Sequence, residues 1–142
     1  MTDLVRAKQR LVEENLTLVL VKGDASYTSE SRGIGALLQL AETNQDFRGY
    51  SAADTIVGRA AALLYVALGV SAVYAKVISE GAIPLLNAHG IALEYGEVTE
   101  GIVNRTGSGP CPMEATVSDI NTPEFAIPRL REKLNSMMKK TV

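Results

Sequence analysis

The segment Asn104–Thr116, NRTGSGPCPMEAT, concentrates the side chains of this sequence that could do chemistry. It holds the only cysteine, Cys111, followed by Pro112 and then Glu114. Proline favours the first position of a helix, because its missing N–H would have no partner there. The spacing therefore predicts a helix that begins at Pro112 with Cys111 as its N-cap. Glu114 would be the third helical residue and could accept the Cys111 backbone N–H, as in a capping box.

Two interpretations of this helix start are open. A structural cap explains Pro112 and Glu114, but it does not explain Cys111, because cysteine is not a favoured N-cap residue. A functional site explains all three. A thiol at the positive end of a helix dipole is favoured as the nucleophilic thiolate, and Glu114 could act as an acid or base. Cys111 is therefore a candidate nucleophile or modification site.

The residues just before the cysteine suit an anion. Arg105 supplies a guanidinium, and glycine-rich backbone can present its N–H groups as an anion nest. The order differs from a phosphatase loop, in which arginine follows the cysteine, and the third glycine of a dinucleotide fingerprint is absent. We predict that the anion of a ligand is held by Arg105 and by the backbone of Gly107, Ser108 and Gly109.

Asp54 is a second carboxylate candidate. Ser51 and Asp54 match a capping box, and apolar residues recur at helical spacing over residues 56–68, so the pattern predicts one helix over residues 51–68. Asp54 would lie in its first turn, either as a cap or as a carboxylate at the mouth of a ligand crevice. Gly58 inside such a helix costs about 1 kcal/mol against alanine, which indicates that another group comes close to it.

Lys76 and a glycine pair offer weaker signals. Lys76 stands in the apolar run Val70–Ile78, which predicts a strand, and it either extends to solvent or points into a crevice. Gly33 and Gly35 open a short predicted helix beside Arg32, where phosphate could bind or the chain could simply turn.

The elements that position these residues predict an α/β fold. An amphipathic opening helix precedes a hairpin over residues 16–30, and helices and strands then alternate to a final helix after residue 122. Strand–helix–strand units require right-handed crossovers and a largely parallel sheet, to which the hairpin adds an antiparallel edge. We predict a three-layer α/β/α sandwich with a mixed sheet of four to five strands. Residues 96–104 fit either a short helix or a weak strand.

Composition bounds the function. The 142 residues suit a single domain over residues 1–142. A formal charge of −2 argues against nucleic acid as a partner. The longest uncharged run, over residues 60–75, is too short for a membrane span. One cysteine cannot form an internal disulfide, which favours the cytoplasm, and the charged N-terminus contains no signal-peptide core. No cofactor is indicated.

Four segments together resemble one family. They are VGRAAALL, VYAKVIS, EGAIPLLNAHGI and NR-x-G-x-G-x-CPME, which begin at residues 57, 73, 80 and 104. The chain resembles the small prokaryotic family known as domain of unknown function 1893, which is similar in fold to cytidine deaminases. The resemblance implies a five-stranded mixed sheet with helices on both faces, a fifth strand within residues 96–104, and a homo-oligomer, with a dimer through helix faces favoured. It also implies that a crevice is lined by Asp54, Lys76, Gly81, Arg105, Cys111 and Glu114.

The resemblance does not extend to zinc chemistry. A zinc deaminase needs His-x-Glu or Cys-x-Glu at one helix start and Pro-Cys-x-x-Cys at the next. The predicted helix starts near Asp54 and near Ser79 carry neither motif, and Cys111 and His89 are the only residues of their types. We therefore expect no zinc and no zinc-dependent deaminase activity.

Three functions stay open at this point. The first is a zinc-free pocket for a small-molecule ligand, a nucleotide or related phosphorylated metabolite, in which Asp54 and Glu114 meet hydroxyl groups or act as acid and base. The second is a metal-independent transferase or hydrolase that uses Cys111 or a carboxylate. The third is a non-catalytic regulatory or assembly module.

Overall fold

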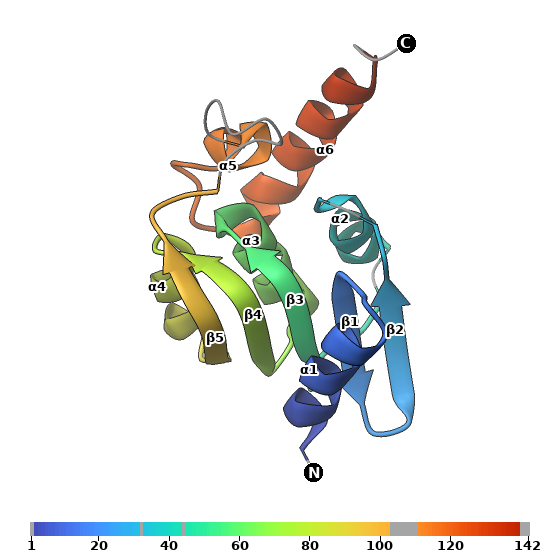
Figure 1. The fold of residues 1–142 in the computed structure, drawn as a ribbon. Coiled ribbons are helices and arrows are strands. Elements are labelled where there is room, and N and C mark those ends of the chain that lie inside the picture. Colours follow the sequence, from blue (N-terminus) through green and yellow to red (C-terminus); the bar gives the residue numbers. More distant parts are fainter. Residues whose placement is uncertain (1, 32, 44, 103–110, 140–142) are drawn as a thin grey trace.

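The computed structural model describes residues 2–31, 33–43, 45–102 and 111–139. Within these ranges the chain forms six helices and one five-stranded sheet with the strand order β2-β1-β3-β4-β5 (Figure 1). The strands are β1 (Leu18–Lys22), β2 (Ala25–Ser29), β3 (Ser51–Val57), β4 (Ala72–Ser79) and β5 (Ala92–Thr99). The helices are α1 (Asp3–Glu13), α2 (Gly35–Glu42), α3 (Arg59–Leu68), α4 (Ala82–Ala88), α5 (Pro112–Thr116) and α6 (Pro123–Lys139).

The strand directions bring three helix starts to one end of the sheet. β1 is antiparallel to both β2 and β3, whereas β3, β4 and β5 are parallel. β2, β3 and β4 therefore run in the same direction, and the helices that follow them, α2, α3 and α4, all begin at the carboxyl end of the sheet. This is the upper end in Figure 1. Open α/β sheets bind ligands outside the carboxyl ends of their strands.

Each face of the sheet has its own core. On one face α1 buries Ala7 and Leu11 against Val19, Val21 and Ala53. On the other face, the larger core contains residues of α2, α3, α4, α5 and α6. α3 lies at its centre, and its Leu63, Leu64 and Tyr65 are fully buried. The mixed sheet with helices on both faces agrees with the predicted fold class.

The predicted helix over residues 51–68 is wrong in its first half. Residues Ser51–Val57 form β3, which lies between β1 and β4, and only α3 is helical. Asp54 therefore lies in a strand, and no capping box with Ser51 exists. Helical spacing misled the prediction because the small side chains of a central strand run directly into an apolar helix. The β-branched run Thr55, Ile56 and Val57 was the correct signal.

The implied place of the fifth strand is also wrong. The additional strand of the sheet is β3, and the described part of the segment, residues 96–102, contains no separate strand beyond the end of β5. β5 continues the predicted strand that begins at Ile91 and extends to Thr99, so residues 96–99 are strand. Residues 103–104 lie outside the described residues.

Several local predictions are confirmed. The hairpin of β1 and β2, the helix α2 after the glycine pair and the helix α5 with Pro112 at its start all form. α3 ends at Gly69, which has a φ of 77°. No helix within the described ranges has the length and hydropathy of a membrane span.

Gly69→Ala should destabilise the fold by about 1–2 kcal/mol, because a Cβ raises the energy of a left-handed backbone. A Cβ built at Gly69 would also lie 2.7 Å from Cγ of Arg48, which would have to move. Urea denaturation measures the difference in unfolding free energy. Gly35→Ala is the matched control, because its Cβ would meet only Leu134 at 4.0 Å. Equal effects of the two substitutions would contradict the explanation.

Candidate functional site

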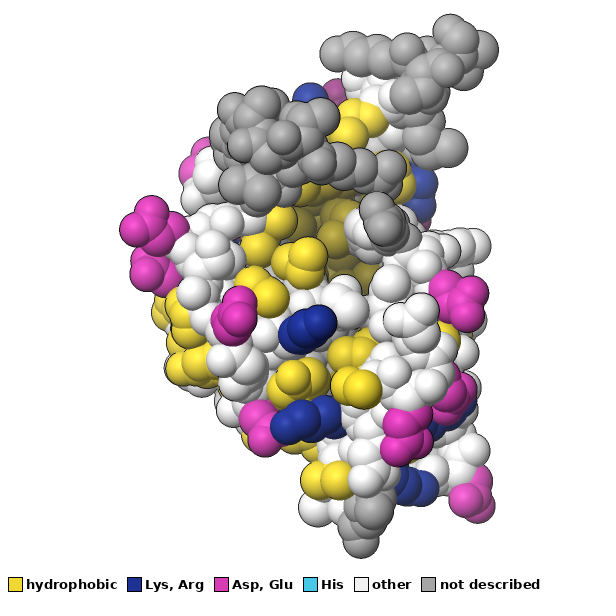
Figure 2. Space-filling model, in the orientation of Figure 1, with side chains coloured by type: hydrophobic (Ala, Val, Ile, Leu, Met, Phe, Trp, Pro, Cys, Tyr) yellow, Lys and Arg dark blue, Asp and Glu magenta, His cyan; other side chains and the backbone are white. Residues whose placement is uncertain are grey.

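A recess with hydrophobic walls opens at the carboxyl end of the sheet. In Figure 2, which has the orientation of Figure 1, it lies between the end of β3 and α2. Its position matches the end of the sheet at which α2, α3 and α4 begin. We refer to this hollow as the recess.

Asp54 and Tyr65 form a polar pair within the larger core. Asp54 is partly buried on β3, and Tyr65 is fully buried on α3. The Tyr65 hydroxyl donates a hydrogen bond of 2.6 Å to Oδ2 of Asp54. The backbone N–H of Ile56 lies 3.3 Å from Oδ1 and donates to it. Asp54 therefore points to the face of the sheet that α3 covers, three residues before β3 ends.

The surroundings change the acidity of both groups. Burial raises the pKa of Asp54 to about 6, although the hydrogen bonds from Tyr65 and the backbone favour its ionised form. Burial and the adjacent carboxylate raise the pKa of Tyr65 well above its usual value. An acid that titrates near neutral pH can both release and take up a proton, as general acid–base catalysis requires.

Glu114 caps a helix that is distant in the sequence. Its Oε1 accepts the backbone N–H of Arg59 at 2.7 Å, and its Oε2 accepts that of Ala60 at 2.8 Å. These are first-turn N–H groups of α3, which have no partner within the helix. The predicted bond to Cys111 is wrong, because the Cys111 N–H donates to the carbonyl of Ile102. The Glu114 carboxylate thus occupies the positive end of α3.

Gly58 permits this contact. It is the N-cap residue of α3, and a Cβ built on it would lie 2.1 Å from Oε1 of Glu114. The sequence pattern predicted that Gly58 lies inside a helix, and this prediction is wrong. The expectation that another group comes close to it is confirmed.

Arg59 makes further hydrogen bonds between α3 and the residues that follow α5. Its guanidinium donates to the carbonyl oxygens of Val117 and Ile120 and to the side-chain oxygen of Asn121. Its backbone N–H meanwhile donates to Glu114. Gly81, before α4, leaves room for the Arg59 stem, since a Cβ there would lie 3.2 Å from its Cδ. Gly81 therefore has a packing role beside Arg59.

Cys111 is the N-cap residue of α5, as predicted. It is partly exposed, it is a free thiol, and it packs against the larger core. Its side chain makes no capping hydrogen bond. Its role as a nucleophile stays a prediction.

The other predicted site residues lie apart from this group or outside the description. Ala75 faces the larger core, so the alternation along β4 turns the exposed Lys76 to the opposite face of the sheet. Arg105, Gly107, Ser108 and Gly109 lie outside the described residues. Among the residues that the structure describes, no cluster of three or more His, Cys, Asp or Glu could hold a metal ion.

Sequence reasoning missed Tyr65 and Arg59. The apolar segment 60–75 contains two aromatic residues, Tyr65 and Tyr74. A buried tyrosine hydroxyl usually needs a hydrogen-bond partner. That requirement was the available signal for a buried acceptor. No signal in the sequence identifies the carbonyl groups that Arg59 binds.

Asp54→Asn should change how stability depends on pH. Since burial raises the Asp54 pKa from 3.8 to about 6, the folded state holds this proton more tightly than the unfolded state. The contribution of Asp54 to stability therefore falls as pH rises from about 4 to 6. Relative to wild type, the unfolding free energy of the variant should rise by about 1–3 kcal/mol between pH 4 and pH 7.

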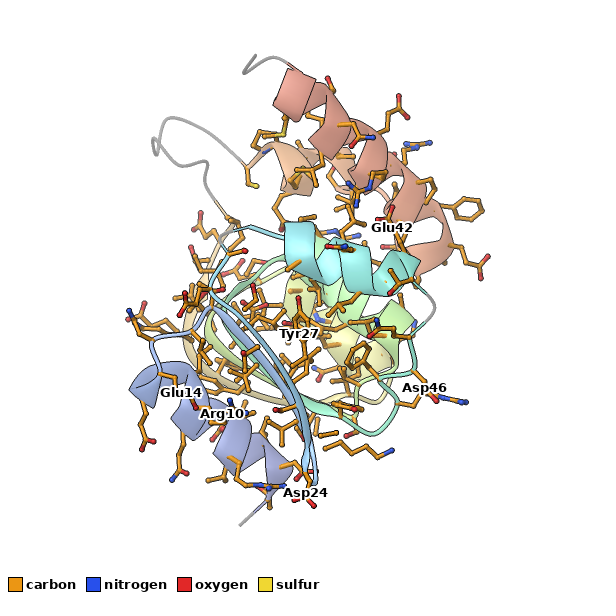
Figure 3. All side chains as sticks on the ribbon, turned by 90° about the vertical axis from the view of Figure 1, so that its right-hand side faces the viewer. Arg10, Glu14, Asp24, Tyr27, Glu42 and Asp46 are labelled. Carbon is orange, nitrogen blue, oxygen red and sulfur yellow. The ribbon has the colours of Figure 1, made fainter. Side chains whose placement is uncertain are left out.

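Denaturant titration at several pH values measures this difference. Asp46→Asn is the control, because the Arg48 side chain holds the pKa of the exposed Asp46 at about 2 (Figure 3). Its difference from wild type should stay constant over the same range. A constant difference for Asp54→Asn would contradict the burial argument.

Gly58→Ala should destabilise the protein by at least about 2 kcal/mol, because the new methyl group displaces the Glu114 carboxylate from two N–H groups. Glu114→Gln should cost about 1 kcal/mol, since it keeps one acceptor oxygen but loses the charge. Thermal unfolding measures both, with Glu132→Gln on the exposed side of α6 as the control. If Gly58→Ala costs no more than the control substitution, Glu114 does not depend on Gly58.

Comparisons with known proteins give one consistent result. The family model described as "Domain of unknown function (DUF1893)", TM1506, matches residues 6–134. No curated protein matches the chain. The crystal structure of a DUF1893 family protein, TM1506 from Thermotoga maritima, is similar with a TM-score of 0.85 and 27% sequence identity, over 94% of this chain and 91% of that chain. The chain therefore belongs to the DUF1893 family.

Proposed function

We propose that the recess binds a small-molecule ligand, a nucleotide or related phosphorylated metabolite, without zinc. The observation that carries the proposal is the Asp54–Tyr65 pair, a carboxyl group with a pKa near 6 inside an otherwise apolar core. Buried polar groups of this kind, next to an apolar hollow, mark candidate ligand sites.

In this proposal Asp54 accepts a hydroxyl or ring N–H of the ligand. Asp54 lies on the face of β3 that α3 covers, three residues before the strand ends. The recess opens at that end of the strand (Figure 2). Tyr65 holds one of its oxygens and thereby fixes the direction of the carboxyl group. At neutral pH Asp54 is mainly ionised, so it can accept two hydrogen bonds or take up a proton.

The anion of the ligand is assigned to the start of α2. The N-cap residue of α2, Ile34, makes no side-chain hydrogen bond, and the first turn contains no acidic residue. First-turn N–H groups favour an anion. The equivalent groups of α3 are already bound to Glu114. The sequence-based assignment of Arg105 and residues 107–109 to the same anion stays a prediction.

Three further points belong to the proposal. The likeness to cytidine deaminases supports a crevice at this end of the sheet, but it does not assign a reaction. A single cysteine favours a cytoplasmic location. The partly exposed thiol of Cys111 supports a second candidate, a metal-independent transferase or hydrolase.

Isothermal titration tests the proposal with ribonucleoside 5′-monophosphates and inorganic phosphate as probes, after native mass spectrometry of untagged protein for a retained ligand. We expect a nucleotide to bind, and Asp54→Asn to weaken it about tenfold through loss of a charged acceptor. Asp24→Asn is the matched control, because Asp24 is exposed in the β1–β2 turn at the opposite end of the sheet (Figure 3).

Other results would point elsewhere. A ligand whose affinity is unchanged by Asp54→Asn does not use the proposed site. Absence of a retained ligand, together with no binding of any probe at millimolar concentration, would favour the regulatory or assembly module.

A further inference from the structure

An open groove runs beside α1, on the face of the sheet that α1 covers. It has a volume of about 380 Å³. Five of its lining residues belong to α1, and the sixth belongs to the edge strand β5. They are Val5, Lys8, Gln9, Val12, Glu13 and Glu94. We refer to it as the α1 groove.

α1 has apolar residues on two sides. Ala7 and Leu11 are buried against the sheet, as an amphipathic helix requires. Val5 and Val12 line the α1 groove instead, and they are 41% and 72% exposed. They are seven residues apart, which places them on the same side of a helix. The second apolar row is therefore not explained by the fold of one chain.

Lys8 lies at the centre of the groove and is held in place. Its Nζ lies 3.6 Å from Oε1 of Glu94 and 4.7 Å from the centre of the Tyr74 ring. Both Lys8 and Glu94 remain about half exposed, so a surface ion pair of this kind adds little stability. The half-exposed ammonium group of Lys8 can therefore also form an ion pair with a carboxylate of a partner.

The charges along the groove are self-complementary. Lys8 is basic, and Glu13, further along α1, is acidic. When two copies of α1 pair antiparallel, Lys8 of each copy lies next to Glu13 of the other. The twofold axis then passes between residues 10 and 11, and the two highly exposed Val12 side chains lie beside it. A twofold interface of this type uses the same surface on both copies.

We propose that the α1 groove binds a second copy of this chain, with the two α1 helices antiparallel. The contact places Val12 of each copy against Gln9 of the other, and it forms two equivalent Lys8–Glu13 pairs. α1 spans 11 residues, or about 16 Å, so the interface is small. We expect a dimer with a dissociation constant in the micromolar range, as is typical of small interfaces.

Sedimentation velocity from 1 µM to 1 mM tests the proposal, since the chain has a mass of 15.2 kDa and a dimer twice that mass. Val12→Asp should raise the dissociation constant at least tenfold, because it places two carboxylates beside the axis. Its circular dichroism and unfolding midpoint should stay unchanged, because Val12 is exposed in one chain. Phe125→Asp, at a residue 66% exposed on α6, is the matched control and should leave the dimer intact.

A charge exchange tests the antiparallel arrangement itself. Glu13→Lys leaves the Lys8–Glu94 pair in place, yet it brings the new ammonium group of one copy beside Lys8 of the other, and should weaken the dimer about tenfold. Adding Lys8→Glu and Glu94→Lys in the same chain reverses all three charges, so the pair within each chain and the pairs between copies both re-form, and should restore the affinity to within about threefold. A monomer at 1 mM, an equal effect of Phe125→Asp, or failure of the triple exchange to restore affinity would each overturn the proposal.

Discussion

The hydrogen bonds of Glu114 to the start of α3 connect the helix that carries Tyr65 with the segment that carries Cys111. α3 is the central helix of the larger core, and its free N–H groups at Arg59 and Ala60 need an acceptor. That acceptor comes from α5, a short helix whose Met113 is also buried in the larger core. In the opposite direction, the Arg59 side chain of α3 donates hydrogen bonds to the carbonyl oxygens of Val117 and Ile120, which follow α5. Together they fix Cys111 beside the core.

Local signals predicted the elements whose ends are marked by proline or glycine. Pro112 marked the start of α5, and Gly69 marked the end of α3. The sequence analysis missed the strand β3. Ser51–Val57 forms a strand because it pairs with β1 on one side and β4 on the other. Spacing along the chain cannot express that condition, which is why Asp54 was assigned to a helix.

The candidate site was predicted by residue type more accurately than by role. Asp54 and Glu114 were both identified as carboxylates of interest, and both make unusual contacts. Asp54 was expected at a helix start but lies in the core next to Tyr65. Glu114 was expected to bind Cys111 in its own helix, but it binds α3 instead. These roles depend on residues 11 and 55 positions away, which only the tertiary structure brings together.

The close fit between Gly58 and Glu114 has a consequence for the evolution of the family. A Cβ at position 58 would lie 2.1 Å from Oε1 of Glu114 and 2.8 Å from Cγ1 of Ile102, so a shorter acceptor at 114 alone would not make room for it. A larger residue at position 58 therefore needs room from both of these neighbours. Among related sequences, a residue other than glycine at position 58 should occur only together with smaller residues at both 102 and 114.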